Sequence, residues 1–242
     1  MEHELWLTAL FNNNLAGAGN FFLELVKQPA QERPWANFVT MELLVAVLLM
    51  LLAAVAKSQL SVEKPGGLQH TLEVLHEFLD GQAAENIAHH REKYMAFFGT
   101  VFLFILLSNL IGLIPGMESP TMFHYVPAGC GLATFAYYHL QGIREHGPWK
   151  YFKTFFGPMP AAAVLMFPIE VISHLARPLS LTIRLYANMY AGEMVTVVFL
   201  GMVPLAIPAI FMGLHFFVGF IQAYVFTLLA MIYVGGAVSH EH

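Results

Sequence analysis

Charged residues are scarce in this sequence of 242 amino acids: they make up 11% of it, whereas hydrophobic residues make up 57%. Soluble domains carry about 25% charged residues, so the chain lacks the polar surface that a protein of this size needs in water. Cysteine is nearly absent, and Cys130 alone excludes an internal disulfide framework and a thiolate metal cluster. The 11 basic residues are outnumbered by 16 acidic ones, which excludes a nucleic-acid surface built on basic clusters. These absences predict a protein that is embedded in membrane lipid.

Five apolar stretches are long enough to form membrane-embedded helices, since one crossing needs about 20 residues. The first is broken only by Thr40 and Glu42, and the third is weakened by Pro127 and three glycines. The last two exceed one crossing, so each is either a broken pair of helices or one long, strongly tilted helix. A short turn around Met202 joins them as an antiparallel hairpin. The five stretches cover residues 38–56, 94–114, 121–143, 159–203 and 205–238.

A further helix is predicted between Gly66 and Ile87, where leucines recur at helical spacing with charged residues between them. This pattern favours an amphipathic helix along the membrane surface; a soluble helix packed on a partner is the alternative. The predicted fold class is an all-α membrane protein with about five membrane-embedded helices and this surface helix. The sequence divides into an outer-side N-terminal segment (1–37), a region with the first span, the surface helix and a transmembrane hairpin (38–158), and the long tilted hairpin (159–242).

Lysine and arginine are unevenly distributed among the connections. Residues 57–93 carry four of the 11 and residues 144–153 carry three, whereas the connection 115–120 carries none. Because cytoplasmic loops are enriched in basic residues, five crossings place the N-terminus outside and the C-terminus in the cytoplasm. Glu2 and Glu4 stand where a signal peptide would be basic, so no cleaved targeting segment is expected.

Ionisable residues within the long hairpin are the strongest functional signal, because a charge in the hydrocarbon region is costly and indicates function by default. At about 100° per residue, six polar side chains share one stripe of the first hairpin helix. A seam of this length cannot face lipid and must face protein or water. The stripe consists of Glu170, Ser173, Arg177, Ser180, Arg184 and Asn188.

The second hairpin helix carries a polar face of its own, with His215 and Gln222 seven residues apart. Glu193 turns to the side opposite Arg184, so it is not expected to form an ion pair with that arginine. Glu193 and His215 lie at similar distances from the turn, so these two side chains could meet. Arg184 and Gln222 are similarly matched, nearer the middle of the membrane.

These residue types suit ion translocation rather than bond-making catalysis. An arginine keeps its proton at any accessible pH, so it can attract and release a carboxylate but cannot pass a proton on. A glutamate and a neutral histidine in contact can hold and pass protons near pH 7. We therefore expect no catalytic site, no cofactor and, without a His-Glu-x-x-His pattern, no metal. Arg177, which precedes Pro178, could instead be an interfacial residue whose side chain snorkels to the surface.

Three segments resemble subunit a of the F-type rotary ATP synthase. The first, RPLSLTIRLYANMYAGE, spans residues 177–193. The second, LHFFVGFIQAYVF, spans residues 214–226 and is similar to the family's last helix. The third, NLIGLIP at residues 109–115, is similar to the end of its second crossing. The resemblance extends over about residues 38–242.

This resemblance implies a proton-translocating stator subunit in the bacterial cytoplasmic (inner) membrane. In the family, two offset half-channels reach a carboxylate on each subunit of a rotating c-ring, and an essential arginine, here Arg184, separates them. Proton flow is thereby coupled to rotation and to ATP synthesis elsewhere in the complex. The implied partners are the c-subunit ring, b-type peripheral stalk subunits, the remaining ATP synthase subunits and lipid. The implied outer half-channel residues are Asn188, Glu193, His215 and Gln222, and the implied cytoplasmic exit residues are Glu170, Ser173 and His174.

The sequence departs from the family at the outer mouth. Many relatives carry an acidic residue where this chain has Gly112, and they often show Asp and Asn where it has residues 120–127. The mouth is therefore expected to be built differently, with Glu118 or His124 as candidates.

Two other functions are compatible with a polar hairpin inside the membrane. A secondary transporter with a substrate site between broken helices would show two similar halves, but the long hairpin has no counterpart in the N-terminal half. A membrane haem or quinone protein would need paired histidines on facing helices, and only His215 lies deep in a predicted span.

Overall fold

The computed structural model describes residues 4–25, 27–61, 65–87, 90–114, 116–156, 163–202 and 206–239, and the regular structure in these ranges is entirely helical. The predicted all-α fold is therefore confirmed. The chain begins with α1 (Trp6–Leu25), α2 (Asn37–Gln59), α3 (Gly67–Asn86) and α4 (Glu92–Ile111). The 3-10 turn η1 (Pro120–Met122), α5 (Tyr125–His146), α6 (Pro148–Thr154), α7 (Ala163–Met202) and α8 (Ala206–Val238) follow.

Within the described residues, four helices are long and apolar enough to cross a membrane: α2, α4, α7 and α8. The third predicted span, α5, is less apolar because glycines and polar residues interrupt it. It nevertheless packs against both α7 and α8 and so belongs to the same bundle. The structure thus keeps all five predicted helices, although one of them falls below the hydropathy of a membrane span.

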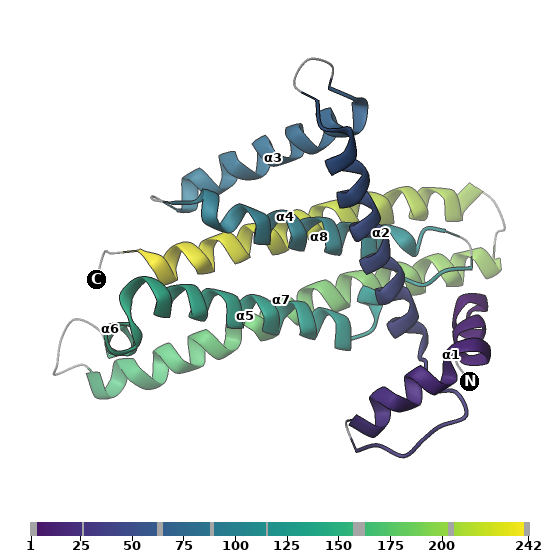
Figure 1. The fold of residues 1–242 in the computed structure, drawn as a ribbon, viewed down its shortest axis with the longest axis horizontal. Coiled ribbons are helices and arrows are strands. Elements are labelled where there is room, and N and C mark those ends of the chain that lie inside the picture. The colour runs from purple at the N-terminus through teal and green to yellow at the C-terminus, as the bar shows by residue number, and fades with distance from the viewer. Residues whose placement is uncertain are drawn as a thin grey trace.

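The helix α7 is continuous through Pro168 and Pro178, so it is one long helix and not a broken pair. Its 40 residues extend for about 60 Å, twice the thickness of the hydrocarbon core. It can therefore be accommodated in a bilayer only with a strong tilt. The helix α2, with 23 residues, is close to the length of a direct crossing, and Figure 1 shows it running steeply across α4, α5, α7 and α8.

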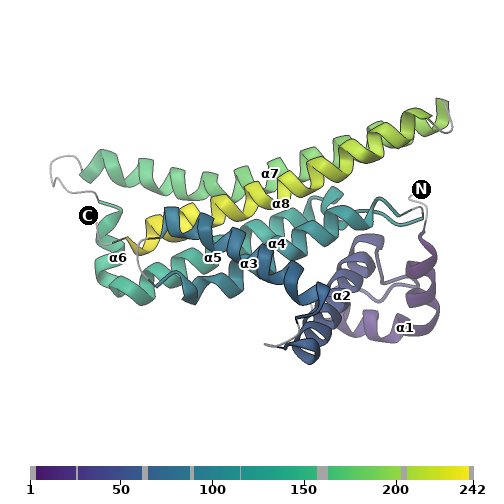
Figure 2. The same ribbon diagram turned by 90° about the horizontal axis from the view of Figure 1, so that it is seen from above.

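The helices α7 and α8 lie together along one side of the molecule, and α1 and α2 lie on the opposite side (Figure 2). The end of α7 and the start of α8 lie at the same end of the molecule as α1, whereas α6 and the end of α8 lie at the other end (Figures 1 and 2). The orientation predicted from the basic residues, with the N-terminus outside and the C-terminus in the cytoplasm, stays a prediction. The core lies between α4, α5, α7 and α8, around buried Phe98, Phe102, Leu185, Met189 and Phe226.

The predicted surface helix is present as α3, which packs on α4 and α8 through buried Leu79 and Ala83. Asp80 connects it to the start of α4, because Arg91 Nε and Nη2 donate to its two carboxylate oxygens at 2.8 and 3.1 Å. This paired hydrogen bond holds the pKa of the partly buried Asp80 carboxyl below its ordinary value. The far end of α3 touches α8 closely, where a Cβ added to Gly235 would collide with the backbone carbonyl of Asn86.

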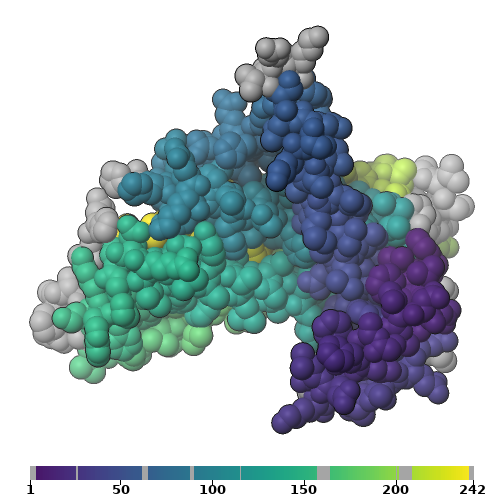
Figure 3. All heavy atoms as spheres, viewed as in Figure 1, coloured from purple at the N-terminus to yellow at the C-terminus, as the bar shows by residue number. Residues whose placement is uncertain are grey.

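The N-terminal segment contains a helix, α1, to which the sequence analysis gave no secondary structure. It is kinked at Leu15, whose φ is −124° and whose carbonyl accepts a hydrogen bond from the Trp35 indole at 2.8 Å. Asn12 binds the backbone of Trp35 through both its Oδ1 and its Nδ2. These bonds fold residues 30–36 back along α1, which forms a separate lobe beside the start of α2 (Figure 3).

Candidate functional site

Arg184 lies on the exposed outer face of α7, away from the other helices of the chain. Ser173, Ser180 and Asn188 are also exposed, so much of the predicted polar stripe does face outward from the subunit. Ile183 and Leu179, which lie near Arg184 in the sequence of α7, are apolar and exposed. Among the described residues, no carboxylate oxygen lies within 4 Å of Arg184. A charge on an apolar membrane face is costly unless a partner or water meets it.

One turn further along, Asn188 joins α7 to α8. Its Nδ2 donates to Gln222 Oε1 at 2.9 Å, and Gln222 is buried at 3% exposure. The spacing placed Gln222 at a level similar to that of Arg184, and the residue that Gln222 bonds is Asn188, one turn further along α7. The residues predicted to line the outer path therefore meet one turn beyond the arginine.

His215 lies against Gly192, the residue that precedes Glu193 on α7. A Cβ on Gly192 would lie 2.9 Å from His215 Nδ1, so the imidazole fills the space that a side chain there would occupy. Glu193, the next residue, lies against the backbone of Ser119. No hydrogen bond or ion pair joins Glu193 to His215 within the described ranges. The predicted meeting of the Glu193 and His215 side chains therefore stays a prediction.

Several polar atoms at this contact are buried without a partner. In the described part of the chain, these include Glu193 Oε2, His215 Nε2 and Gln222 Nε2. Buried polar groups are normally hydrogen-bonded, often to ordered water, so these three atoms along the contact between α7 and α8 are available to bind water.

A buried polar network, which sequence reasoning missed, fixes the loop beside Glu193. Asn109 Nδ2 donates to the Gly219 carbonyl on α8 at 3.0 Å, and its Oδ1 accepts from Thr121 Oγ1 at 2.7 Å. Ser119 Oγ lies 2.8 Å from Thr121 Oγ1 and donates to the Ser108 carbonyl at 2.8 Å. The available signal was an asparagine near the end of an otherwise apolar span. The network holds the α4–α5 connection firmly against α7 and α8.

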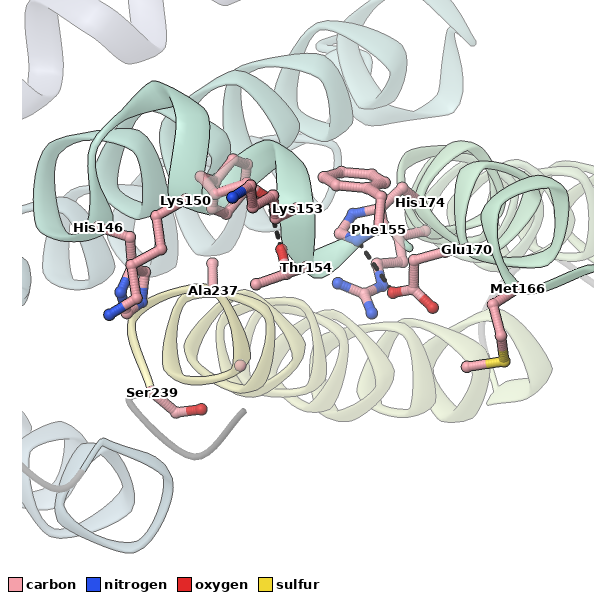
Figure 4. A pocket seen from close by; sticks show the side chains of 13 residues that line it. His146, Lys150, Lys153, Thr154, Phe155, Met166, Glu170, His174, Ala237 and Ser239 are labelled. Atoms are coloured by element: carbon pink, nitrogen blue, oxygen red, sulfur yellow. Dashed lines mark hydrogen bonds and ion pairs between the residues drawn. The ribbon is translucent and has the colours of Figure 1, made fainter. Parts of the chain in front are cut away.

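At the other end of the molecule, a cavity of about 470 Å³ opens between α6, α7 and the end of α8. Figure 4 shows Glu170 and His174 on α7, with Phe155 beside His174 at 4.8 Å between ring centres. His174 Nε2 lies 3.2 Å from Glu170 Oε1, and its Nδ1 lies 2.9 Å from the hydroxyl of Tyr138. Two of the three predicted exit residues therefore line one cavity. The third, Ser173, is exposed and is not among the residues that line it.

Arg177 also lines this cavity and so points into the protein rather than snorkelling outward. Its guanidinium lies 5.1 Å from the ring centre of Tyr233 and 5.8 Å from that of Tyr138. Both distances are within the range of cation–π attraction. Sequence reasoning placed Arg177 on the stripe but could not identify the two rings, which come from α5 and α8.

Tyr151 closes the wall of the cavity on α6. Its hydroxyl lies 2.8 Å from His139 Nδ1 on α5, and Gly142 leaves room for its ring. Burial raises the pKa of Tyr151 to about 12, against the opposing effect of Arg177. A raised pKa means that folding favours the protonated phenol, so the hydroxyl remains available for this bond until the pH approaches that value.

We predict that Tyr151→Phe loosens α6 without unfolding the bundle. The substitution removes one hydrogen bond, for which about 1 kcal/mol is typical, and leaves the packing of the ring intact. Amide exchange in residues 148–154 should become faster, by up to about fivefold if that energy stabilises the local closed state. Thr154→Val is the matched control, because its hydroxyl binds only the Tyr151 carbonyl on the same helix. Unchanged exchange in Tyr151→Phe would contradict a role for this bond in holding α6.

Comparisons with known proteins agree on one family. The sequence model of the family described as ATP synthase A chain matches residues 38–235. The chain is 57% identical over 233 residues to ATP synthase subunit a of Solibacter usitatus, covering 96% of this chain and all of that protein. It is 48% identical to ATP synthase subunit a of Koribacter versatilis, with full coverage of both. With its apolar helices, the chain is a multi-pass membrane protein that belongs to the ATP synthase A chain family.

Proposed function

We propose that this chain is the proton-translocating stator subunit of a bacterial ATP synthase. In this proposal it lies in the cytoplasmic membrane with its N-terminus outside and its C-terminus in the cytoplasm, and it has no catalytic site of its own. The observation that carries the proposal is Arg184, an exposed guanidinium on an apolar membrane face without an acidic partner among the described residues. A ring of c subunits, each with a carboxylate at mid-membrane, would supply that partner.

The exposed face of α7 and α8 is suited to such a contact. Leu175, Leu179 and Ile183 are exposed on α7, and Phe217 and Phe220 are exposed on α8. An apolar surface of this kind can face lipid or the apolar helices of a moving partner with little preference. A ring could therefore slide along it, and only the guanidinium would distinguish one ring position from the next.

Arg184 acts in this proposal as a fixed positive barrier between two proton paths. A carboxylate that approaches the guanidinium is favoured in its charged form, so it gives up its proton before passing. Arg184 keeps its own proton and cannot carry the released one across. The released proton must therefore leave through one path, while the carboxylate is reprotonated from the other after it has passed.

The two paths are offset along the hairpin. On the outer side, the orphaned atoms of Glu193, His215 and Gln222 support a line of water that reaches Asn188. On the cytoplasmic side, the cavity that contains Glu170 and His174 supports the exit. A proton that moves down a membrane potential of 100 mV releases about 2.3 kcal/mol of free energy. Several protons must therefore pass for each ATP made elsewhere in the complex. The peripheral stalk and the other subunits would hold this chain still against the ring.

We predict that Glu193→Gln and His215→Ala slow proton flow without abolishing it. Each removes one group that can exchange protons, while water and the remaining polar groups still fill the path. Passive proton conduction through membrane vesicles stripped of the catalytic sector should fall by about tenfold to a hundredfold in each variant. Asn13→Ala, a change on exposed α1, provides the control. Parent-like conduction in both variants would remove this path from the mechanism.

A further inference from the structure

The cavity between α6, α7 and the end of α8 carries more positive charge than its proposed role in proton exit uses. Lys150, Lys153 and Arg177 line it, and among the described residues Glu170 is the one acidic group in its wall. The Glu170 carboxylate is already engaged by His174, whose Nε2 lies 3.2 Å from its Oε1. The volume of about 470 Å³ is that of a small-ligand site, for which about 300–1,000 Å³ is typical. The charge of the wall therefore favours an anionic ligand.

The two lysines are the basic groups of this wall that have no acidic partner. Lys150 and Lys153 are three residues apart on α6, so they are neighbours on its surface. Both are exposed, and within the described ranges no carboxylate oxygen lies within 4 Å of either ammonium group. Arg177, by contrast, lies over two tyrosine rings. Figure 4 shows Lys150 and Lys153 at the α6 end of the cavity and Glu170 at the other end. An anion at the lysines therefore need not approach the carboxylate.

An exposed apolar surface adjoins the lysines. Trp149 and Phe152 on α6 are 81% and 51% exposed, and Met166 on α7, which lines the cavity, is 38% exposed. The rings of Phe152 and Phe156 lie 6.3 and 5.0 Å from that of Phe167 on α7, measured between centres. These rings join the two helices into one apolar surface. A water-soluble anion would leave this surface in contact with water, whereas the acyl chains of a lipid would cover it.

The position of α6 is that of a helix at the membrane surface. Gly147 has a φ of 77°, a left-handed conformation that glycine adopts readily, and it turns the chain between α5 and α6. The helix α6 lies at the end of the bundle where α7 begins and α8 ends (Figure 1). Because α7 and α8 are membrane spans, this end reaches the lipid headgroups. An exposed tryptophan is typical of the interface, and basic pockets between membrane helices bind anionic headgroups.

We propose that the α6 end of this cavity binds the headgroup of an anionic phospholipid. Lys150 and Lys153 bind the phosphate oxygens, and the acyl chains lie along Phe152 and Met166. A phosphatidylcholine is a poorer ligand, because its quaternary ammonium group offsets the phosphate charge and is repelled by the lysines. The site holds lipid whether or not protons leave through the other end of the cavity.

The test is photolabelling of the purified membrane sector in phosphatidylcholine vesicles that contain a trace of phosphatidylglycerol with a diazirine on one acyl chain. A phosphatidylcholine probe with the same acyl chain gives the background, and labelling of residues 148–156 above that background is the specific labelling. In the double variant Lys150→Gln/Lys153→Gln, specific labelling should fall by about thirtyfold, which corresponds to about 1 kcal/mol for each lysine near anionic lipid. Lys150→Arg/Lys153→Arg keeps both charges and should retain most of the specific labelling.

The matched control is Lys57→Gln/Arg144→Gln. These two exposed basic residues belong to connections predicted to lie on the same side of the membrane, but they do not line the cavity. Specific labelling in this control should equal that of the parent. An equal loss in both double variants would overturn the site, because the general surface charge would then explain the binding. Parent-like labelling in Lys150→Gln/Lys153→Gln would overturn it as well.

A competition experiment distinguishes a lipid from a soluble phosphate compound. Unlabelled phosphatidylglycerol should displace the probe, whereas soluble glycerol phosphate should not, because it lacks the chains that cover the apolar surface. Displacement by glycerol phosphate as effective as that by the lipid would overturn the assignment to a lipid.

Amide exchange in residues 148–154 shows whether the two lysines act through the lipid. Phosphatidylglycerol should slow this exchange in the parent but not in Lys150→Gln/Lys153→Gln, and equal slowing in both would overturn the role of the lysines. Neither photolabelling nor exchange requires proton flow. A failure of the proposed function in conduction measurements would therefore leave both results unchanged.

Discussion

Replacing Arg184 by alanine should abolish proton-driven ATP synthesis while leaving the complex assembled. We expect at least about a hundredfold loss, the scale seen when one preorganised charge-stabilising group is removed. The reason is that a rotor carboxylate passing an uncharged position has no cause to release its proton. Synthesis is measured in vesicles energised by an imposed proton gradient and membrane potential.

Assembly should survive because the fold does not depend on this side chain. Arg184 is exposed and forms no ion pair within the described residues, whereas its neighbours Leu181 and Leu185 are buried in the core. Substitutions of exposed residues away from such core contacts usually change stability by less than about 0.5 kcal/mol. The amount of this subunit that co-purifies with the ring should therefore equal that of the parent.

A second measurement on the same variant, passive proton leakage through the membrane, tests directly whether Arg184 is a barrier. If the guanidinium separates two water paths, its removal should permit passive proton leakage while synthesis is lost. Arg184→Lys keeps a positive charge but lacks the planar guanidinium that binds a carboxylate through two hydrogen bonds. It should therefore still prevent proton leakage but should support ATP synthesis only weakly. Ser180→Ala, one turn earlier on the same exposed face, is the matched control and should synthesise ATP normally. Normal coupled synthesis in Arg184→Ala would refute the role assigned to the arginine.

The helices of this chain could be predicted largely from hydropathy, because lipid selects for long apolar helices with few charges. The ends of the helices were less predictable, and the α4–α5 connection shows the reason. Apolar residues continue to Ile114, but α4 ends at Ile111 because Gly112 packs directly on Ser119. Thr121 was expected to begin the next span and instead belongs to η1, where its hydroxyl binds Asn109. Local polar bonds, which hydropathy does not register, decided these boundaries.

The same close contact explains a departure from the family. A Cβ on Gly112 would lie 2.9 Å from both the Cβ and the backbone N of Ser119. An acidic side chain therefore cannot be accommodated here while the loop keeps this conformation. The nearest carboxylate of this connection in the sequence is Glu118, six residues later.

Helical spacing predicted which candidate residues share a face, but not which atoms they contact. It placed Arg184 and Gln222 at a similar level, but it could not predict that the Gln222 amide bonds Asn188, because the register of two packed helices depends on side-chain volumes. The tyrosines around Arg177 and the bond between His174 and Tyr138 join separate helices. The periodicity of a single helix cannot predict such contacts between helices. The roles assigned to the site residues stay predictions until the variants are measured.

The largest structural effect should come from Gly131→Val on α5. A Cβ at this position would lie 2.8 Å from Thr182 Oγ1 and 2.9 Å from the Pro178 carbonyl on α7, closer than real Cβ contacts allow. The Pro178 oxygen belongs to the backbone, so α5 must move away from α7. Overpacking of a core in this way typically costs about 1–3 kcal/mol, and here it acts on the helix that carries Arg184. We expect a lower midpoint of thermal dissociation of the purified complex and a reduced yield of assembled subunit.

Gly129→Val provides the control for this prediction, because nothing lies within 4 Å of a Cβ added two residues earlier on the same helix. Both variants make the same change in composition and in helix propensity, so only the contact with α7 differs. Adding Thr182→Ala to Gly131→Val should restore part of the lost stability, since it relieves the contact with Oγ1 but not the one with the Pro178 carbonyl. Equal stability of the Gly129 and Gly131 variants would show that α5 and α7 are not packed as closely as the structure places them. Arg184 would then lack the rigid support from α5 that its position as a barrier requires.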